Sequence, residues 1–111
     1  MGSEKTDFIR GTLDMLILKV LSLEPMHGWG ICQRIELMSA SSLVVQQGSL
    51  YASLHRLTRE GWIRSYWQDT DSGRRARYYA LTKAGEKQAA VETDQWLRLS
   101  AGVGRLISAT S

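Results

Sequence analysis

The stretch Gly48-Ser49-Leu50-Tyr51-Ala52-Ser53-Leu54-His55-Arg56-Leu57 combines a helical apolar repeat with a polar outer face. The three leucines are spaced by four and three residues, which predicts a helix whose leucines face a core. The helix is expected to stop at Gly61, a residue type that suits the left-handed position after a helix. Its outer face then offers side chains to a partner, with Tyr51 near the edge: Ser49, Tyr51, Ser53, His55, Arg56 and Arg59.

Beyond Gly61 the pattern becomes that of a β-hairpin followed by a helix. Residues 62–68 and 76–81 have the aromatic and aliphatic content of strands, and the turn formers at 69–73 lie between them. Thr82 is a suitable N-cap, and the chain from Lys83 onward is rich in helix formers. A long final helix is therefore expected to run to at least Ala101.

Upstream, the spacing predicts two helices and one very short strand. One stripe at helical spacing consists of Leu13, Leu16, Ile17, Val20 and Leu21, and a second stripe consists of Ile31, Ile35 and Met38. Residues 43–45, Leu-Val-Val, have the β-branched content of a short strand. The order of helix, helix, short strand, helix, hairpin and helix predicts an α+β, mainly helical fold.

This order is typical of a winged helix-turn-helix domain, in which the second helix of the motif lies in the major groove of DNA. We expect that domain in residues 1–82, and a C-terminal dimerisation helix and tail in residues 83–111. Positive charge is concentrated where such a domain would need it. Residues 55–83 hold seven Arg or Lys against three Asp or Glu, so this segment carries +4 and the rest of the chain −1.

Three arginines, Arg74, Arg75 and Arg77, lie at and just after the hairpin turn. Guanidinium groups at such a tip suit phosphates or a narrow minor groove. Charge alone would equally fit a solvated hairpin. Its coincidence with a candidate recognition helix favours duplex DNA as the partner, and a winged helix that binds only protein or RNA is the alternative.

Four segments resemble the PadR-type transcriptional regulators: His-Gly-Trp-Gly-Ile at 27–31, the stretch 48–57 quoted above, Glu-Gly-Trp-Ile at 60–63, and Arg-Arg-Ala-Arg-Tyr-Tyr-Ala-Leu-Thr at 74–82. The likeness extends over about residues 7–100. It implies a winged helix with a C-terminal dimerisation helix, and a repressor that leaves its operator when an effector binds or another signal arrives. The length fits the branch with a single C-terminal helix. Trp29 stands where Tyr is usual and Ala52 where Pro is usual, which bears on local packing and contacts.

The final helix carries an apolar stripe at the 3, 4, 3 spacing of a short coiled coil: Trp96, Leu99, Val103 and Leu106. We expect this stripe to pair with a second copy of the chain, in a homodimer; the alternative is that it packs back on the first helix. Gly102 and Gly104 weaken the end of this helix. In some short PadR-like proteins tryptophans of this helix border a cavity for flat aromatic compounds, so Trp96 is either an effector contact or plain interface packing.

Catalysis and metal binding are not indicated. The two histidines and the lone Cys32 have no ligand spacing, so no cofactor or metal is expected; His27 is expected to cap or pack at the start of the second helix. The longest apolar run, Met15 to Leu18, is far too short to cross a membrane, and no secretory signal is evident. We therefore expect a cytoplasmic transcriptional regulator without membrane association and not an enzyme.

Overall fold

The computed structural model of the chain describes residues 2–110, with side chains from Thr12 onward. Over these residues the elements are α1 (Gly2–Leu21), β1 (Met26–His27), α2 (Gly28–Met38), α3 (Gln47–Arg59), β2 (Ile63–Asp69), β3 (Arg75–Leu81) and α4 (Lys83–Thr110). This order confirms the predicted mainly helical fold with a hairpin between its last two helices, the arrangement of a winged helix. Helix α4 runs on past Ala101, through both of its late glycines, to Thr110.

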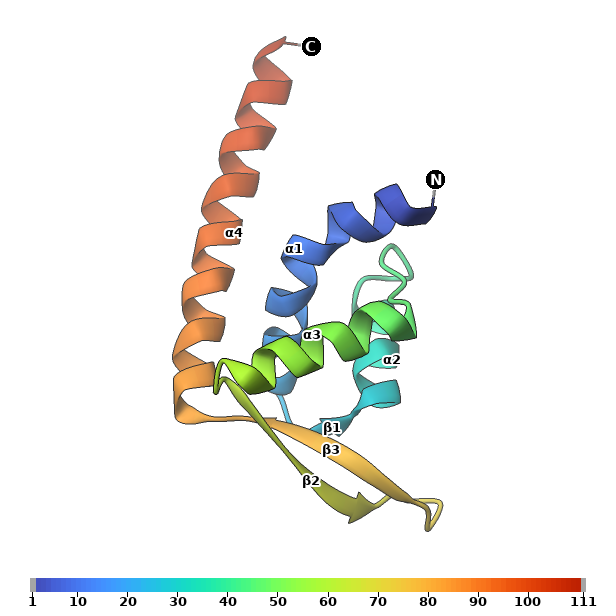
Figure 1. Cartoon of the computed structure of the whole chain (residues 1–111). Helices are drawn as coiled ribbons and strands as arrows, with labels where there is room; N and C mark the ends of the chain where they lie inside the picture. The colour runs from blue at the N-terminus through green and yellow to red at the C-terminus, as the bar shows by residue number, and fades with distance from the viewer. Residues whose placement is uncertain (1, 111) are drawn as a thin grey trace.

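The helices α1, α2 and α3 surround one apolar core, and the hairpin and α4 leave that core in opposite directions (Figure 1). The side chains almost fully removed from solvent are Ile17, Leu18, Ile31, Leu50, Leu54 and Leu57, and all of them except Leu18 belong to the predicted stripes. All three leucines of the helix quoted first are among them. Packing against this core therefore fixes which face of α3 is left outside.

The sheet has three antiparallel strands in the order β1-β3-β2. The strand added to the hairpin is β1, in which Met26 pairs with Tyr79 and His27 pairs with Tyr78. The prediction of a strand at residues 43–45 is therefore wrong. That connector turns instead, because Ala40 and Ser41 adopt left-handed φ values of 52° and 64°, and the amide of Leu43 donates to the Ser39 hydroxyl at 3.1 Å.

Helix α2 is shorter on its inner face than its spacing predicts. Ile31 and Ile35 are buried, but Met38 is 64% exposed. Met38 is the last residue of the helix, and Ser39 caps it, so this final turn lies beyond the edge of the core. The prediction that Met38 belongs to the inward stripe is wrong.

The junction between hairpin and α4 is tightly built. Gly61 has a φ of 79°, as its predicted role requires, and the Thr82 hydroxyl both donates to the Gly61 carbonyl at 2.7 Å and accepts from the Gly85 amide at 3.0 Å. The predicted N-cap is confirmed. A Cβ atom on Gly85 would lie 1.8 Å from the Trp62 carbonyl oxygen, so only glycine allows α4 to start this close to β2. These contacts set the direction in which α4 leaves the domain.

Candidate nucleic-acid interface

The outer face of α3 is a continuous exposed stripe. Tyr51, His55 and Arg59 are exposed, and Ser49 is half-buried at its side. Tyr51, His55 and Arg59 follow one another at intervals of four residues, so they form one row along the helix. The structure therefore places four of the predicted α3 residues where a major groove could meet them.

Ser53 is not part of that stripe. Its side chain is 1% exposed, because it lies three residues after Leu50 and four before Leu57, on the buried face of α3. Its prediction as an outward residue is wrong. Its hydroxyl is satisfied within the protein, since it accepts a hydrogen bond from Nη2 of Arg56 at 3.0 Å.

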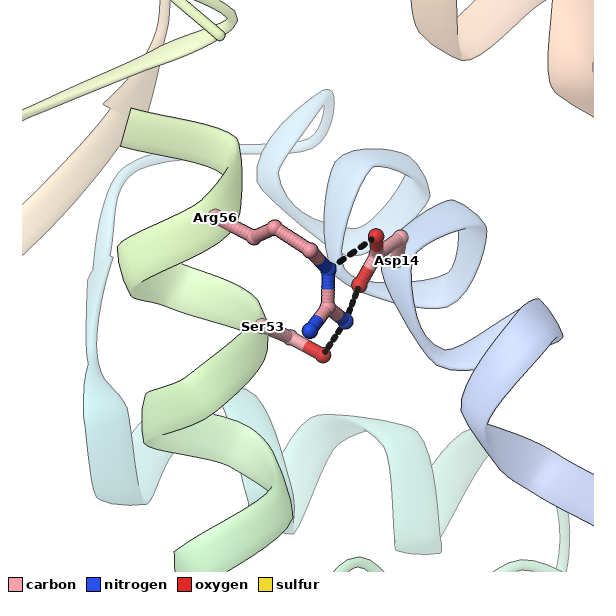
Figure 2. Close-up of polar contacts among 3 residues, drawn as sticks. All are labelled: Asp14, Ser53 and Arg56. Atoms are coloured by element: carbon pink, nitrogen blue, oxygen red, sulfur yellow. Dashed lines mark hydrogen bonds and ion pairs between the residues drawn. The ribbon is translucent and has the colours of Figure 1, made fainter. Parts of the chain in front are cut away.

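Arg56 is partly buried and contacts another helix of the protein. Its Nε donates to Oδ2 of Asp14 at 3.2 Å and its Nη2 to Oδ1 at 2.8 Å, a two-pronged contact from α3 to α1 (Figure 2). The hydrogen bond to Asp14 raises the pKa of Arg56 despite the opposing effect of burial. The outward orientation predicted for Arg56 is therefore wrong. Sequence reasoning had no partner for it, because Asp14 lies 42 residues earlier.

The wing consists of β2, β3 and the turn that joins them. Asp69 pairs with Arg75 at the tip of the ladder, the Thr70 amide donates to the Arg74 carbonyl at 2.6 Å, and Gly73 has a φ of 86°. Because this residue is a glycine, its left-handed conformation closes the turn with little strain. Arg74, Arg75 and Arg77 are all exposed, as predicted.

A groove of about 470 Å³ runs between the wing, α3 and the start of α2. It brings Tyr51 together with the three wing arginines, whereas the other predicted α3 residues lie outside it along the helix. Sequence reasoning did not assign Trp29 and Tyr79 to a site, yet both line this groove. Trp29 is 59% exposed, and burial raises the pKa of Tyr79. The sequence offered one sign that Trp29 belongs to a site: a Trp stands there where Tyr is usual.

The start of α2 adds favourable electrostatics to this groove. His27 is the N-cap, and its Nδ1 accepts from the Gly30 amide at 3.0 Å, which confirms its predicted capping role. The amides at a helix start and the positive end of its dipole attract anions. Gly28 allows Tyr51 to pack here, since a Cβ on Gly28 would lie 3.0 Å from the Tyr51 hydroxyl oxygen. One side of the domain thus combines guanidinium groups, a phenol and a helix start, a set suited to phosphates.

The apolar stripe of α4 lies at the opposite end of the molecule. Its members remain partly or largely exposed, at 40% for Trp96, 60% for Leu99, 45% for Val103 and 67% for Leu106. Figure 1 shows the C-terminal half of α4 diverging from α1. Trp96, at the start of the stripe, is the most covered of the four, and it lies where α1 and α4 are still adjacent. The choice between pairing with a second copy and packing on the first helix stays a prediction.

A second groove, of about 420 Å³, lies where α1 and α4 are still adjacent. Its lining consists of Thr12, Met15, Gln88, Glu92, Gln95, Trp96 and Leu99. Two of the four predicted stripe residues, Trp96 and Leu99, therefore face the same open space. Over residues 12–110, no three His, Cys, Asp or Glu side chains gather in a way that could hold a metal ion. No helix of the described chain is long and apolar enough to span a membrane.

Comparisons with known proteins agree with this geometry. The model of the PadR-like family of transcriptional regulators matches residues 17–91. A transcriptional regulator from Clostridium thermocellum is similar with a TM-score of 0.79 and 27% identity, over 89% of this chain and 96% of that one. A PadR-like regulator from Bacillus cereus has a TM-score of 0.79 and 25% identity, over 91% and 96% of the two chains.

A PadR family regulator from Eggerthella lenta has a TM-score of 0.74 and 29% identity, over 96% of this chain and 90% of that one. The family consists of transcriptional regulators that bind DNA and are not enzymes. Its model covers more than half of the sequence, and the fold of this chain matches the winged helix of its PadR-family neighbours. The chain belongs to the PadR-like family of transcriptional regulators.

Proposed function

We propose that this chain is a homodimeric repressor that binds a specific duplex operator and leaves it when a flat aromatic effector binds. In this proposal, residues 1–82 bind DNA and residues 83–111 hold the dimer together. The observation that carries the proposal is the division of the surface. The groove between wing and α3 is lined by Tyr51, Arg74, Arg75 and Arg77, whereas the far half of α4 exposes apolar side chains.

In this proposal, the exposed row on α3 recognises the DNA sequence. His55 and Arg59 are exposed and do not line the wing groove, so they are the side chains we assign to base edges. Ser49 and Tyr51, near the start of the helix, are assigned to phosphates. Arg59→Ala should then relax the preference at one base pair per half-site and cost about 1–3 kcal/mol of specific affinity.

The exposed stripe of α4 supports dimerisation. A single recognition helix covers one half-site, whereas two copies related by a two-fold axis reach adjacent major grooves about 34–36 Å apart. Large exposed apolar side chains on an isolated helix are typical of an interface. The stripe of α4 is therefore assigned to the second copy.

Relief by an effector rests on the groove at Trp96. Asp14 lies on α1 between Thr12 and Met15, two residues that line this groove, and it holds Arg56 of α3 at 2.8 Å. A ligand that displaces α1 would therefore act on α3 through one ion pair. The alternative, that Trp96 serves only interface packing, predicts that aromatic compounds leave operator binding unchanged.

The decisive experiment selects duplexes from a random library and measures affinity at several salt concentrations. A regulator should enrich a palindromic site and lose affinity steeply with salt, because each contacted phosphate releases counterions. Competition with RNA of matched length separates the alternative function. A chain that enriches no duplex, or that prefers RNA, would be an interaction module of another kind.

A further inference from the structure

Trp67 is a large aromatic residue at a position where the fold does not need one. It lies on β2 in the outer half of the wing and is 57% exposed, and it is not among the residues of the hydrophobic core. An exposed tryptophan on a narrow hairpin adds little to the core of the domain. Its neighbours suggest a different use.

Two of the wing arginines lie over the Trp67 ring. The guanidinium carbon of Arg75 is 5.8 Å from the ring centroid and that of Arg77 is 6.0 Å away. The register explains this arrangement, because Trp67 pairs directly with Arg77, and Arg75 is the next residue on the same face of β3. Nε of Arg77 also donates to the Ser65 hydroxyl at 3.0 Å, from the neighbouring position of that face on β2.

This cluster lies next to the groove assigned to DNA. Arg75, Arg77 and Tyr79 alternate along one face of β3, and all three line the groove. A guanidinium group that lies over an aromatic ring keeps its N–H groups available at its edge. The negative face of the ring also offsets the repulsion between two nearby cations.

We propose that Trp67 is a positioning residue for DNA binding, which holds Arg75 and Arg77 in place over its ring before the operator arrives. This inference rests on the proposed function and names how the wing achieves it. Arginine side chains lose rotamer freedom when they bind, and the loss is smaller when they are already held. Trp67 then raises affinity without adding a charge of its own.

The test compares Trp67→Leu, which removes the ring face, with Trp67→Phe, which keeps one. The probe is the duplex enriched by the wild-type protein from a random library. We expect Trp67→Leu to weaken binding about fivefold and Trp67→Phe to stay within about twofold of wild type. Gln68→Leu, a replacement by the same residue on the other face of β2, is the matched control and should bind like wild type.

A double-mutant cycle separates positioning from a structural or direct role. When Arg75 and Arg77 are already Ala, Trp67→Leu should cost nothing further. In the free protein, the δ-protons of Arg75 and Arg77 should show upfield ring-current shifts that disappear in Trp67→Leu. This NMR measurement also shows whether the variant is folded.

The outcomes are distinct. If the wild type binds no duplex, the proposed function fails and this inference fails with it. If the wild type binds and Trp67→Leu binds equally well, only the inference is overturned. The inference is also overturned if the loss persists without the arginines, because Trp67 would then contact DNA itself, or if the arginine protons of the wild type show no ring-current shift.

Discussion

The two ends of this molecule differ in how far the contacts within one chain hold and cover their side chains. At the wing end, side chains that suit DNA are already held in place: Tyr51 packs against Gly28, and Arg75 and Arg77 lie over Trp67. At the α4 end, Leu99 and Leu106 expose 60% and 67% of their surface. The first region is held in place by contacts within one copy of the chain, whereas the second leaves large apolar side chains exposed to solvent.

Under the proposed function, this difference would separate contact with DNA from assembly of the dimer. The recognition helix is fixed by buried leucines on its inner face and by the Arg56–Asp14 ion pair at its side. The far half of α4 has no such support among the described side chains. Only a second copy would place two rigid readers at the spacing that an operator requires.

The largest expected effect comes from changing the exposed end. Leu99→Lys combined with Val103→Lys would place charges in an apolar interface, where unpaired charges are strongly unfavourable. We expect a monomer in analytical ultracentrifugation, with operator affinity reduced roughly 1,000-fold, to about the level of non-specific binding. Circular dichroism should still show a folded domain, because neither residue is in the core.

A matched control adds the same charges to the polar face of α4. Ala101→Lys with Ala109→Lys places them beside Arg98 and Arg105 and should leave the dimer intact. The role assigned to the α4 stripe is wrong if the first variant stays dimeric, or if its monomer binds a palindromic operator as tightly as wild type.

The second effect belongs to the wing. Replacing Arg74, Arg75 and Arg77 with Ala should weaken specific and non-specific binding alike by roughly 100-fold, if each exposed arginine contributes about 1 kcal/mol. The slope of log affinity against log salt should flatten by about 0.9 for each phosphate that the variant no longer neutralises. Titrations at four salt concentrations measure both quantities, and Arg98→Ala with Arg105→Ala on α4 is the control. An unchanged slope in a folded triple variant would remove the wing from the interface.

The sequence predicted the helices and the turns that support this interface more fully than the contacts of its individual side chains. Helical spacing identified the inner leucines of α3, and residue types that adopt special backbone geometry identified Gly61 and Thr82. These signals succeed because they are local. The two-residue strand β1 is too short to show any periodicity, so its pairing with β3 could be seen only in three dimensions.

The errors on α3 have the same origin. The polarity of serine predicts Ser53 on the outer face, yet its position in the repeat puts it inside, where Arg56 donates a hydrogen bond to its hydroxyl. The sequence likewise predicts Arg56 on the outer face, but Asp14 engages it from α1. Composition describes what a side chain can bind, and only the tertiary structure shows which partner is nearest.

The Arg56–Asp14 ion pair is expected to hold α3 rigidly against α1. Asp14→Asn removes the charge that Arg56 contacts and should lower the free energy of unfolding by about 1 kcal/mol, since both side chains are partly shielded. For a domain of this size the melting temperature should fall by about 5 °C. Operator affinity should drop about threefold to tenfold, because α3 would be less firmly oriented.

Glu24→Gln provides the control for that change. It breaks the Arg34–Glu24 pair, which has a single contact at 3.0 Å and a more exposed carboxylate. Surface pairs of this kind contribute little, so melting temperature and affinity should hardly move. Equal losses in the two variants would mean that the Asp14 contact has no special part in orienting α3.

The smallest effect expected at the wing end is that of one hydroxyl group. Tyr51 is 52% exposed in the groove, and the missing side chain of Gly28 lets its hydroxyl lie against the start of α2, where anions are favoured. If this hydroxyl donates to a phosphate, Tyr51→Phe should cost about 0.5–1.5 kcal/mol, or roughly twofold to tenfold in affinity, for specific and unrelated duplexes alike. Tyr66→Phe, on the opposite face of the wing from the arginines, is the control and should bind like wild type. A selective loss for the operator alone would instead make Tyr51 a reader of bases, whereas no loss for either duplex would place its hydroxyl away from the DNA backbone.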